Sequence, residues 1–176
     1  MENKIPANFL HCEELNESDE EIERYSNSLI EVIQNGATLK DVQGVSNDTM
    51  QDIYTLAYEA YQRGNLDDAE SLFRFLCIYD FYNSEYPMGL AAVLQLKKSY
   101  SKAIDFYALA YSLSKEDYRP MLYAGQCNLM LRQVIQAKRC FEIVNERCSD
   151  QRLRHKATAY LSALSKLANN DIQDPE

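Results

Sequence analysis

The sequence predicts an all-α solenoid of stacked helical hairpins, because small and aromatic residues recur along it at one fixed interval. Alanine occupies three equally spaced positions, Ala69, Ala103 and Ala137. An aromatic ring follows four residues after each alanine, at Phe73, Tyr107 and Phe141. This spacing matches the period of the tetratricopeptide repeat, whose unit is a helix, a turn and a second helix. We therefore expect three hairpins that share one continuous core.

Other positions of each hairpin keep their size class at the same interval. A small residue on the first helix lets the two helices approach closely, at Ala57, Ala91 and Gly125. The preceding position is expected to complete the layer between helices, and it holds Leu56, Leu90 and Ala124. The first-helix tryptophan and the closing proline of the repeat consensus are missing, so the consensus does not fix the helix ends.

The start of the chain is strongly acidic. Residues 1–48 carry eleven acidic and three basic side chains, whereas the whole chain has a formal net charge of −9. We expect residues 1–17 to form a solvated, disordered leader. Ser18, followed three residues later by Glu21, fits a capping box and predicts the start of a helix.

This N-terminal helix would have one apolar face that another surface must cover. Its apolar residues recur at three- and four-residue steps. They are Ile22, Tyr25, Leu29, Val32 and Ile33. Gly36 is expected to end the helix. The face could pack on the first repeat or on the same helix of a second subunit, so residues 18–47 form an N-terminal helical region that is a candidate for dimerisation.

The three repeats are expected between residues 48 and 149. Before them, Thr38–Val42 fits a short turn of helix, and Ser46 fits the cap of the next helix. The paired helices are predicted at about 48–63 and 66–80, 85–97 and 100–114, and 119–131 and 134–147. A seventh helix, at about 150–168, has the apolar stripe of a terminal helix that caps a solenoid. The polar tail, residues 169–176, is expected to fray.

The motifs argue against catalysis and metal binding. The five cysteines form no CxxC pair, and the only histidines are His11 and His155. Metal-ligand spacing and a glycine-rich phosphate loop are both absent from the sequence, so we expect no metal, no cofactor and no enzyme activity. Apolar runs fall short of the roughly 20 residues that span a bilayer, which favours a cytoplasmic protein without membrane contact.

Basic residues gather toward the C-terminus. Residues 119–166 hold nine basic and three acidic side chains, a local net charge of +6. The chain as a whole is acidic and would be repelled by phosphate at long range, so we expect no direct binding of nucleic acid. A basic patch that faces an acidic partner, or the chain's own acidic leader, is the simpler interpretation.

The concave side of such a stack is a candidate groove for an extended peptide. First-helix residues about one turn from the small position should line it. They are Tyr54, Tyr58 and Tyr61 in the first unit, Met88, Ala92 and Gln95 in the second, and Leu122 and Gln126 in the third. Aromatic and apolar side chains with a few amides suit an extended segment that carries apolar side chains. The alternatives are that some tyrosines only cover the core, and that the chain is a scaffold joining two folded partners.

Four longer motifs resemble one known family. They are FRFLCIYDFYN at residues 73–83, GATLKDV at residues 36–42, MGLAA at residues 88–92 and GQC at residues 125–127. Together they resemble the class II chaperones of type III secretion translocators. The likeness runs from about residue 22 to residue 167, and it is strongest to the branch that serves invasion-associated secretion systems.

The resemblance implies a small chaperone of the bacterial cytoplasm that binds two hydrophobic, pore-forming translocators before their export. It implies that the groove holds a short extended segment near the translocator's N-terminus. Carried over by position, the aromatic contacts fall on Tyr54, Tyr58 and Tyr61, with a loop-side contact on Tyr79. It also implies a homodimer through the N-terminal region and, in the invasion branch, joint action with a transcription activator. A tetratricopeptide scaffold or co-regulator that binds a transcription activator remains the alternative.

Overall fold

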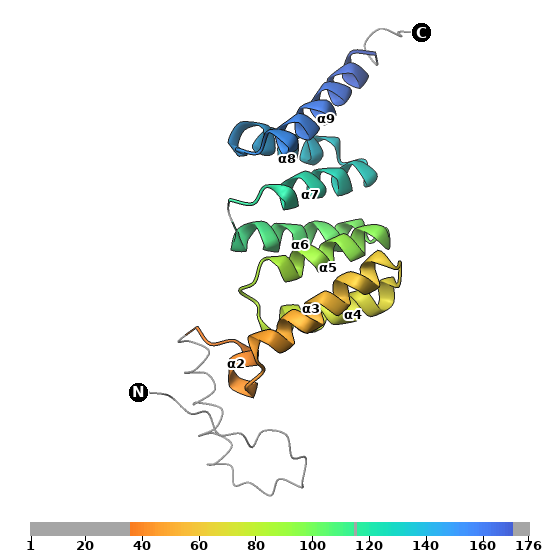
Figure 1. The fold of residues 1–176 in the computed structure, drawn as a ribbon. Helices are drawn as coiled ribbons and strands as arrows, with labels where there is room; N and C mark the ends of the chain where they lie inside the picture. Colours follow the sequence, from red (N-terminus) through yellow and green to blue (C-terminus); the bar gives the residue numbers. More distant parts are fainter. Residues whose placement is uncertain (1–35, 115, 171–176) are drawn as a thin grey trace, which may run out of the picture.

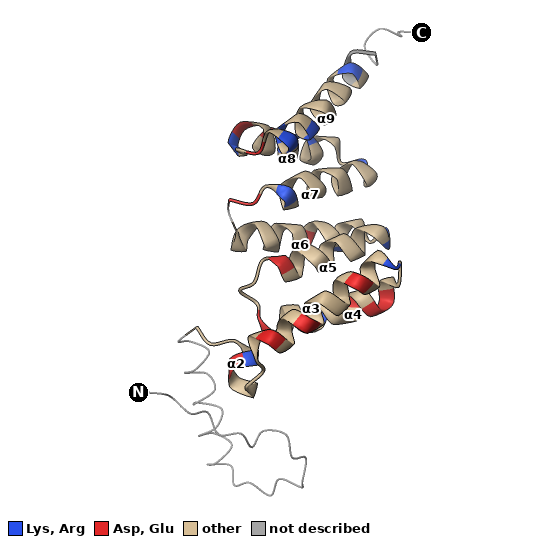
Figure 2. Ribbon diagram, in the orientation of Figure 1, with Lys and Arg blue, Asp and Glu red and all other residues tan. Residues whose placement is uncertain are grey.

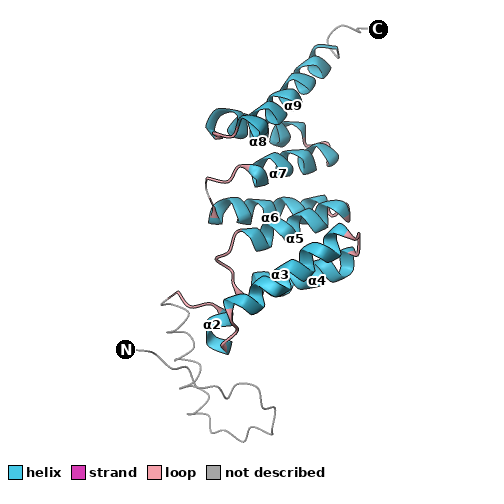
Figure 3. Ribbon diagram, in the orientation of Figure 1, coloured by secondary structure: helices cyan, strands magenta, loops and turns pink. Residues whose placement is uncertain are grey.

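The protein is described by a computed structural model that covers residues 36–114 and 116–170. Within these residues the chain forms eight helices joined by turns and loops, and it contains no strand (Figure 3). The expected leader and the N-terminal helix lie outside the described residues. The candidate dimer residues Ile22, Tyr25, Leu29, Val32 and Ile33 therefore stay a prediction.

The described chain is a solenoid of three helical hairpins between a short first helix and a long last one (Figure 1). Helix α2 spans Leu39–Gln43. The hairpins are α3 (Asn47–Gln62) with α4 (Leu66–Tyr79), α5 (Glu85–Leu96) with α6 (Tyr100–Leu113), and α7 (Arg119–Met130) with α8 (Val134–Arg147). Helix α9 (Gln151–Asn170) packs on α8 at the far end of the stack. The predicted all-α repeat architecture is confirmed, and the repeat helices begin and end within one residue of the expected positions.

Local side-chain chemistry sets where the first helices begin. The Ser46 hydroxyl accepts a hydrogen bond from the backbone N–H of Thr49 at 3.0 Å, which confirms the expected cap of α3. Before α2, the Thr38 backbone N–H and hydroxyl both donate to the Asp41 carboxylate, at 2.8 and 2.6 Å. These hydrogen bonds lower the pKa of Asp41, because they stabilise its charged form.

The same turn closes all three hairpins. The residues that end the first helix in a left-handed conformation are Gly64, Lys98 and Arg132, with φ angles of 78°, 60° and 59°. In each turn the following N–H reaches back to a carbonyl of the helix, at Asn65 to Ala60, Ser99 to Leu94 and Gln133 to Asn128. This pattern satisfies carbonyl groups that the helix end would otherwise leave unpaired.

The alanines and rings that define the period lie in the core. Each of them is at most 2% exposed. Leu90 and Ala124 are also buried, whereas Leu56, expected in the same layer, is 55% exposed, so that expectation is wrong. The reason is position: a hairpin precedes α5 and α7 and covers this site, but no hairpin precedes α3 in the described chain.

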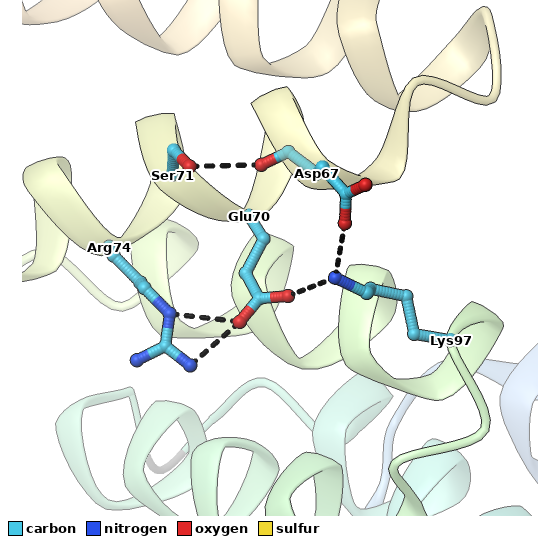
Figure 4. A network of polar contacts seen from close by, with 5 residues as sticks. All are labelled: Asp67, Glu70, Ser71, Arg74 and Lys97. Atoms are coloured by element: carbon cyan, nitrogen blue, oxygen red, sulfur yellow. Dashed lines mark hydrogen bonds and ion pairs between the residues drawn. The ribbon is translucent and has the colours of Figure 1, made fainter.

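Ion pairs connect the first hairpin to its neighbours. Lys97, at the end of α5, donates to Glu70 and Asp67 of α4, both at 2.6 Å (Figure 4). Arg74 donates to the same Glu70 carboxylate at 2.7 and 2.9 Å. The Lys97 and Arg74 hydrogen bonds lower the pKa of Glu70. At the other end of α4, Lys40 of α2 pairs with the nearly buried Asp80 at 2.7 Å.

We predict that Glu70→Gln destabilises the protein in a pH-dependent way. Because the pKa of Glu70 is lowered in the folded state, its contribution is present above the ordinary value of 4.5 and is lost as the pH falls through the folded value. Urea unfolding should show a loss of about 1 kcal/mol at about pH 7 and almost none at about pH 3. Glu59→Gln is the matched control, since its pair with Arg63 lies exposed within one helix. A loss of equal size at both pH values would contradict this account.

Candidate functional site

A pocket of about 390 Å³ opens between the first helices of the three hairpins. Six of the nine residues predicted for the groove line it: Tyr54, Tyr58, Tyr61, Met88, Ala92 and Gln95. The repeat geometry places them together because equivalent positions of α3, α5 and α7 face the same side of the stack. The pocket therefore forms only when the three hairpins are stacked, because no single helix contributes all of its lining residues.

One wall of the pocket is formed by the tyrosines of α3. The Tyr54 ring meets Phe73 edge-to-face, with centroids 5.9 Å apart, and Tyr58 stacks on Tyr61 at 6.3 Å. Tyr58 is 48% exposed, whereas Tyr54 and Tyr61 are half-buried against the core. Burial raises the pKa of Tyr54 and of Tyr61, so both hydroxyls stay protonated near neutral pH and can donate hydrogen bonds.

The floor of the pocket depends on a glycine. Gly89 of α5 has no side chain, and the Phe73 ring of the preceding hairpin lies against its backbone. A Cβ atom at this position would overlap the ring. Gly125 of α7 is also crowded, by Phe141 of its own hairpin. Close approach of helix and ring therefore requires glycine at both positions.

A polar chain crosses the concave side from the second hairpin to α9. The buried Tyr107 hydroxyl donates to the Gln95 side-chain oxygen at 2.7 Å. The Gln95 amide then donates to Gln126 at 3.4 Å, and the Gln126 amide donates to the Tyr160 hydroxyl at 3.1 Å. Each amide nitrogen keeps one further hydrogen, so this row can donate to the backbone carbonyls of a bound segment.

An ion pair stands at the mouth of the pocket. Arg119, at the start of α7, bonds to Glu85, at the start of α5, and to Asp117. Glu85 and Arg119 both line the pocket and are about half exposed. They were not among the residues predicted from the sequence, although a signal existed: they are opposite charges at equivalent positions of successive repeats.

The structure corrects one of the predicted groove residues and leaves two others outside the pocket. Leu122 is fully buried in a cluster with side chains of α8 and Ala157 of α9, so it belongs to the core and not to the groove. Its neighbour Tyr123 lines the pocket instead and stacks on Tyr107. Tyr79 does not reach the pocket: its hydroxyl donates to Gln43 at 2.8 Å, which ties α4 to α2. Gln126 lies beyond the pocket, in the polar chain.

Burial makes some of the cysteines poorly suited to thiol chemistry near neutral pH. Cys77, Cys127, Cys140 and Cys148 are free thiols of the described chain. Burial raises the pKa of Cys77 to about 12 and that of Cys127 to about 11, so neither forms a thiolate readily.

Among the residues with described positions, no three His, Cys, Asp or Glu side chains gather as a metal site would require. None of the described helices combines the length and apolarity that crossing a membrane needs.

Comparison with known proteins gives a consistent result. A tetratricopeptide repeat family model matches residues 50–83 and 84–117. Chaperone protein SicA of Salmonella typhimurium is 55% identical over 154 residues, which cover 88% of this chain and 93% of SicA. The translocator chaperone SycD of Yersinia enterocolitica is 27% identical, with a TM-score of 0.69 over 73% of this chain and 98% of its own.

A further solved structure contains a bound partner. It is PcrH, of Pseudomonas aeruginosa, in complex with the chaperone binding region of PopD. That chain is 29% identical, with a TM-score of 0.67 over 71% of this chain and 97% of its own.

We predict that Gly89→Ala destabilises the protein, although the same change in an ordinary helix interior stabilises it. The added methyl group would overlap Phe73, and overpacking of this kind typically costs about 1 to 3 kcal/mol. Chemical unfolding monitored by circular dichroism measures the change. Ala92→Gly, one turn along the same helix, is the control. It measures how much an exchange between alanine and glycine changes stability in this helix without a clash with Phe73. A more stable Gly89→Ala protein would show that Phe73 can move aside freely.

Proposed function

Because this chain belongs to the class II chaperones of type III secretion, we propose that it binds the hydrophobic translocators of such a system in the bacterial cytoplasm. An extended segment near the N-terminus of each translocator would lie in the concave groove. The observation that carries this proposal is the tyrosine-lined pocket, which spans all three repeats and offers apolar walls beside hydroxyl and amide donors. PcrH, which is similar to this chain in sequence and fold, forms a complex with the chaperone binding region of PopD.

The groove would bind the segment through two kinds of contact, apolar contacts to its side chains and hydrogen bonds to its backbone. Tyr54, Tyr58, Tyr61, Met88 and Ala92 would seat apolar side chains, since they form the walls of the pocket. Gln95 and Gln126 would donate hydrogen bonds to the backbone of the segment. The polar chain holds these two side chains in place. A backbone contact does not depend on sequence, so two different translocators could share one groove.

The benefit of binding follows from the chemistry of the partner. A translocator must carry segments that enter a membrane, and in water such segments associate with one another. Holding the disordered region beside them keeps the translocators apart before export. The segment loses conformational freedom on binding, which limits the affinity and allows release. The free protein would be a homodimer formed through the N-terminal region.

A scaffold that grips a C-terminal carboxylate is less compatible with the pocket. Such a groove needs free basic side chains on the first helices. Arg119 is the single basic residue among the residues that line the described pocket, and it is already paired with Glu85 and Asp117.

Co-expression with each hydrophobic translocator of the same secretion system tests the proposal. We expect each translocator to stay soluble and to co-purify with this protein. Limited proteolysis of the complex should leave a bound N-terminal translocator segment. Insoluble translocators and the absence of a complex would contradict the proposed function.

We predict that Tyr58→Ala combined with Tyr61→Ala weakens binding of that segment at least about tenfold, because aromatic anchors dominate such interfaces. Calorimetric titration measures the affinity, and circular dichroism checks that helix content is unchanged. The matched control is Tyr82→Ala, which removes a tyrosine of similar exposure, 56%, from the loop between α4 and α5. Loss of fold in the double variant would show that these rings serve the core. Equal binding by both variants would remove the tyrosine wall from the site.

A further inference from the structure

The turn between α7 and α8 exposes an unusual amount of apolar surface. Its large apolar side chains are Met130, Leu131, Val134 and Ile135, which are 60%, 37%, 50% and 81% exposed. We refer to these four residues as the third-turn surface. Exposed apolar side chains that gather in one short stretch, as these do, are typical of an interaction site.

The fold itself does not require apolar residues here. The first hairpin has Gln62, Arg63 and Asp67 at the positions equivalent to Met130, Leu131 and Ile135. Its turn nevertheless has the same left-handed residue and the same backbone hydrogen bond. Apolar residues recur elsewhere at the Met130 position, as Leu96, and at the Val134 position, as Leu66 and Tyr100. At the Leu131 and Ile135 positions the other hairpins are polar, so apolar character there is specific to the third hairpin and is not explained by helix or turn formation.

The same turn also places positive charge beside this surface. Arg132 adopts a left-handed conformation, with φ 59°, where the first hairpin has Gly64. A residue other than glycine costs about 1 kcal/mol in such a position. Lys138 and Arg139 follow on the exposed side of α8. Figure 2 shows basic residues on α7, α8 and α9, and acidic residues along α3 and α4.

A segment of opposite character lies outside the described residues. Residues 1–35 contain nine acidic and two basic side chains, a net charge of −7, whereas residues 119–170 carry +6. The same segment contains the apolar series Ile22, Tyr25, Leu29, Val32 and Ile33. It thus combines acidic and apolar residues, as the third-turn surface combines basic and apolar ones.

We propose that residues 13–33 of this chain dock on the third-turn surface. Their apolar side chains would cover Met130 and Ile135, and their carboxylates would face Arg132 and Arg139. Docking removes two apolar surfaces from water in one contact. The inference is independent of translocator binding.

Site-specific photo-crosslinking in the full-length protein tests the docking. A photoreactive amino acid replaces Ile135, and in a matched control it replaces Ile78, which is 62% exposed on α4. We expect crosslinks from position 135 to residues 13–33, and none to that segment from position 78. Raising the salt from about 0.05 M to about 0.5 M should lower the yield several-fold, because salt screens exposed charges. A mixture of isotope-labelled and unlabelled protein shows whether the crosslinked segment belongs to the same chain, as proposed, and crosslinks only between copies would overturn the proposal.

A second variant removes the apolar contact without disturbing the turn. Met130→Gln with Ile135→Ser introduces residues that other hairpins have at these positions, Gln62 and Ser101. Hydrogen exchange of residues 13–33 should become several-fold faster in this variant, with helix content unchanged. Unchanged exchange would overturn the proposal. So would crosslinks from position 135 that reach only a co-expressed translocator, or no segment of residues 13–33.

Discussion

The structure depends on the close approach of helices at positions that have almost no side chain. Ala69, Ala103 and Ala137 are fully buried, and Phe73 lies against Gly89 where any Cβ atom would overlap it. This packing holds each hairpin against the next at a constant spacing. Because the spacing is constant, equivalent residues of α3, α5 and α7 face one side and form a continuous concave surface.

The pocket follows directly from that arrangement. The ring that fills the core of the first hairpin, Phe73, is also a wall of the pocket, so the site and the core share a residue. Tyr107 has the same double role, since it is buried in the core while its hydroxyl fixes the Gln95 amide. A site built in this way is rigid before its ligand arrives, which reduces the entropy that binding must overcome.

The charged residues differ between the two ends of the solenoid, and some of them form ion pairs between hairpins. Acidic residues gather on α3 and α4, and basic residues on α7 to α9 (Figure 2). The pairs between Lys97 and Glu70, and between Arg119 and Glu85, join successive hairpins. Beside the third turn, Arg132 and Arg139 are exposed, whereas Lys138 pairs with Glu142 within α8.

The sequence by itself determined the repeat, the hairpins and about half of the pocket lining, because a constant period fixes which residues are equivalent. It placed Tyr54, Tyr58 and Tyr61 on one side of α3, and the structure has them there. Equivalence by period assumes that every repeat has the same neighbours. That assumption fails at the N-terminal end of the described stack, where no hairpin precedes α3.

Only the tertiary structure decided what lies beside each repeat. Leu122 occupies the position of Tyr54 and Met88, but it is fully buried in a cluster with side chains of α8 and α9, so it is core. Leu56 occupies the position of the buried Leu90, but no hairpin covers it in the described chain. The bond from Gln126 to Tyr160 joins positions one repeat period apart, so α9 packs beside α7 as the first helix of a further unit would. A periodic sequence fixes the direction in which a side chain points, whereas burial depends on whether another element is present there.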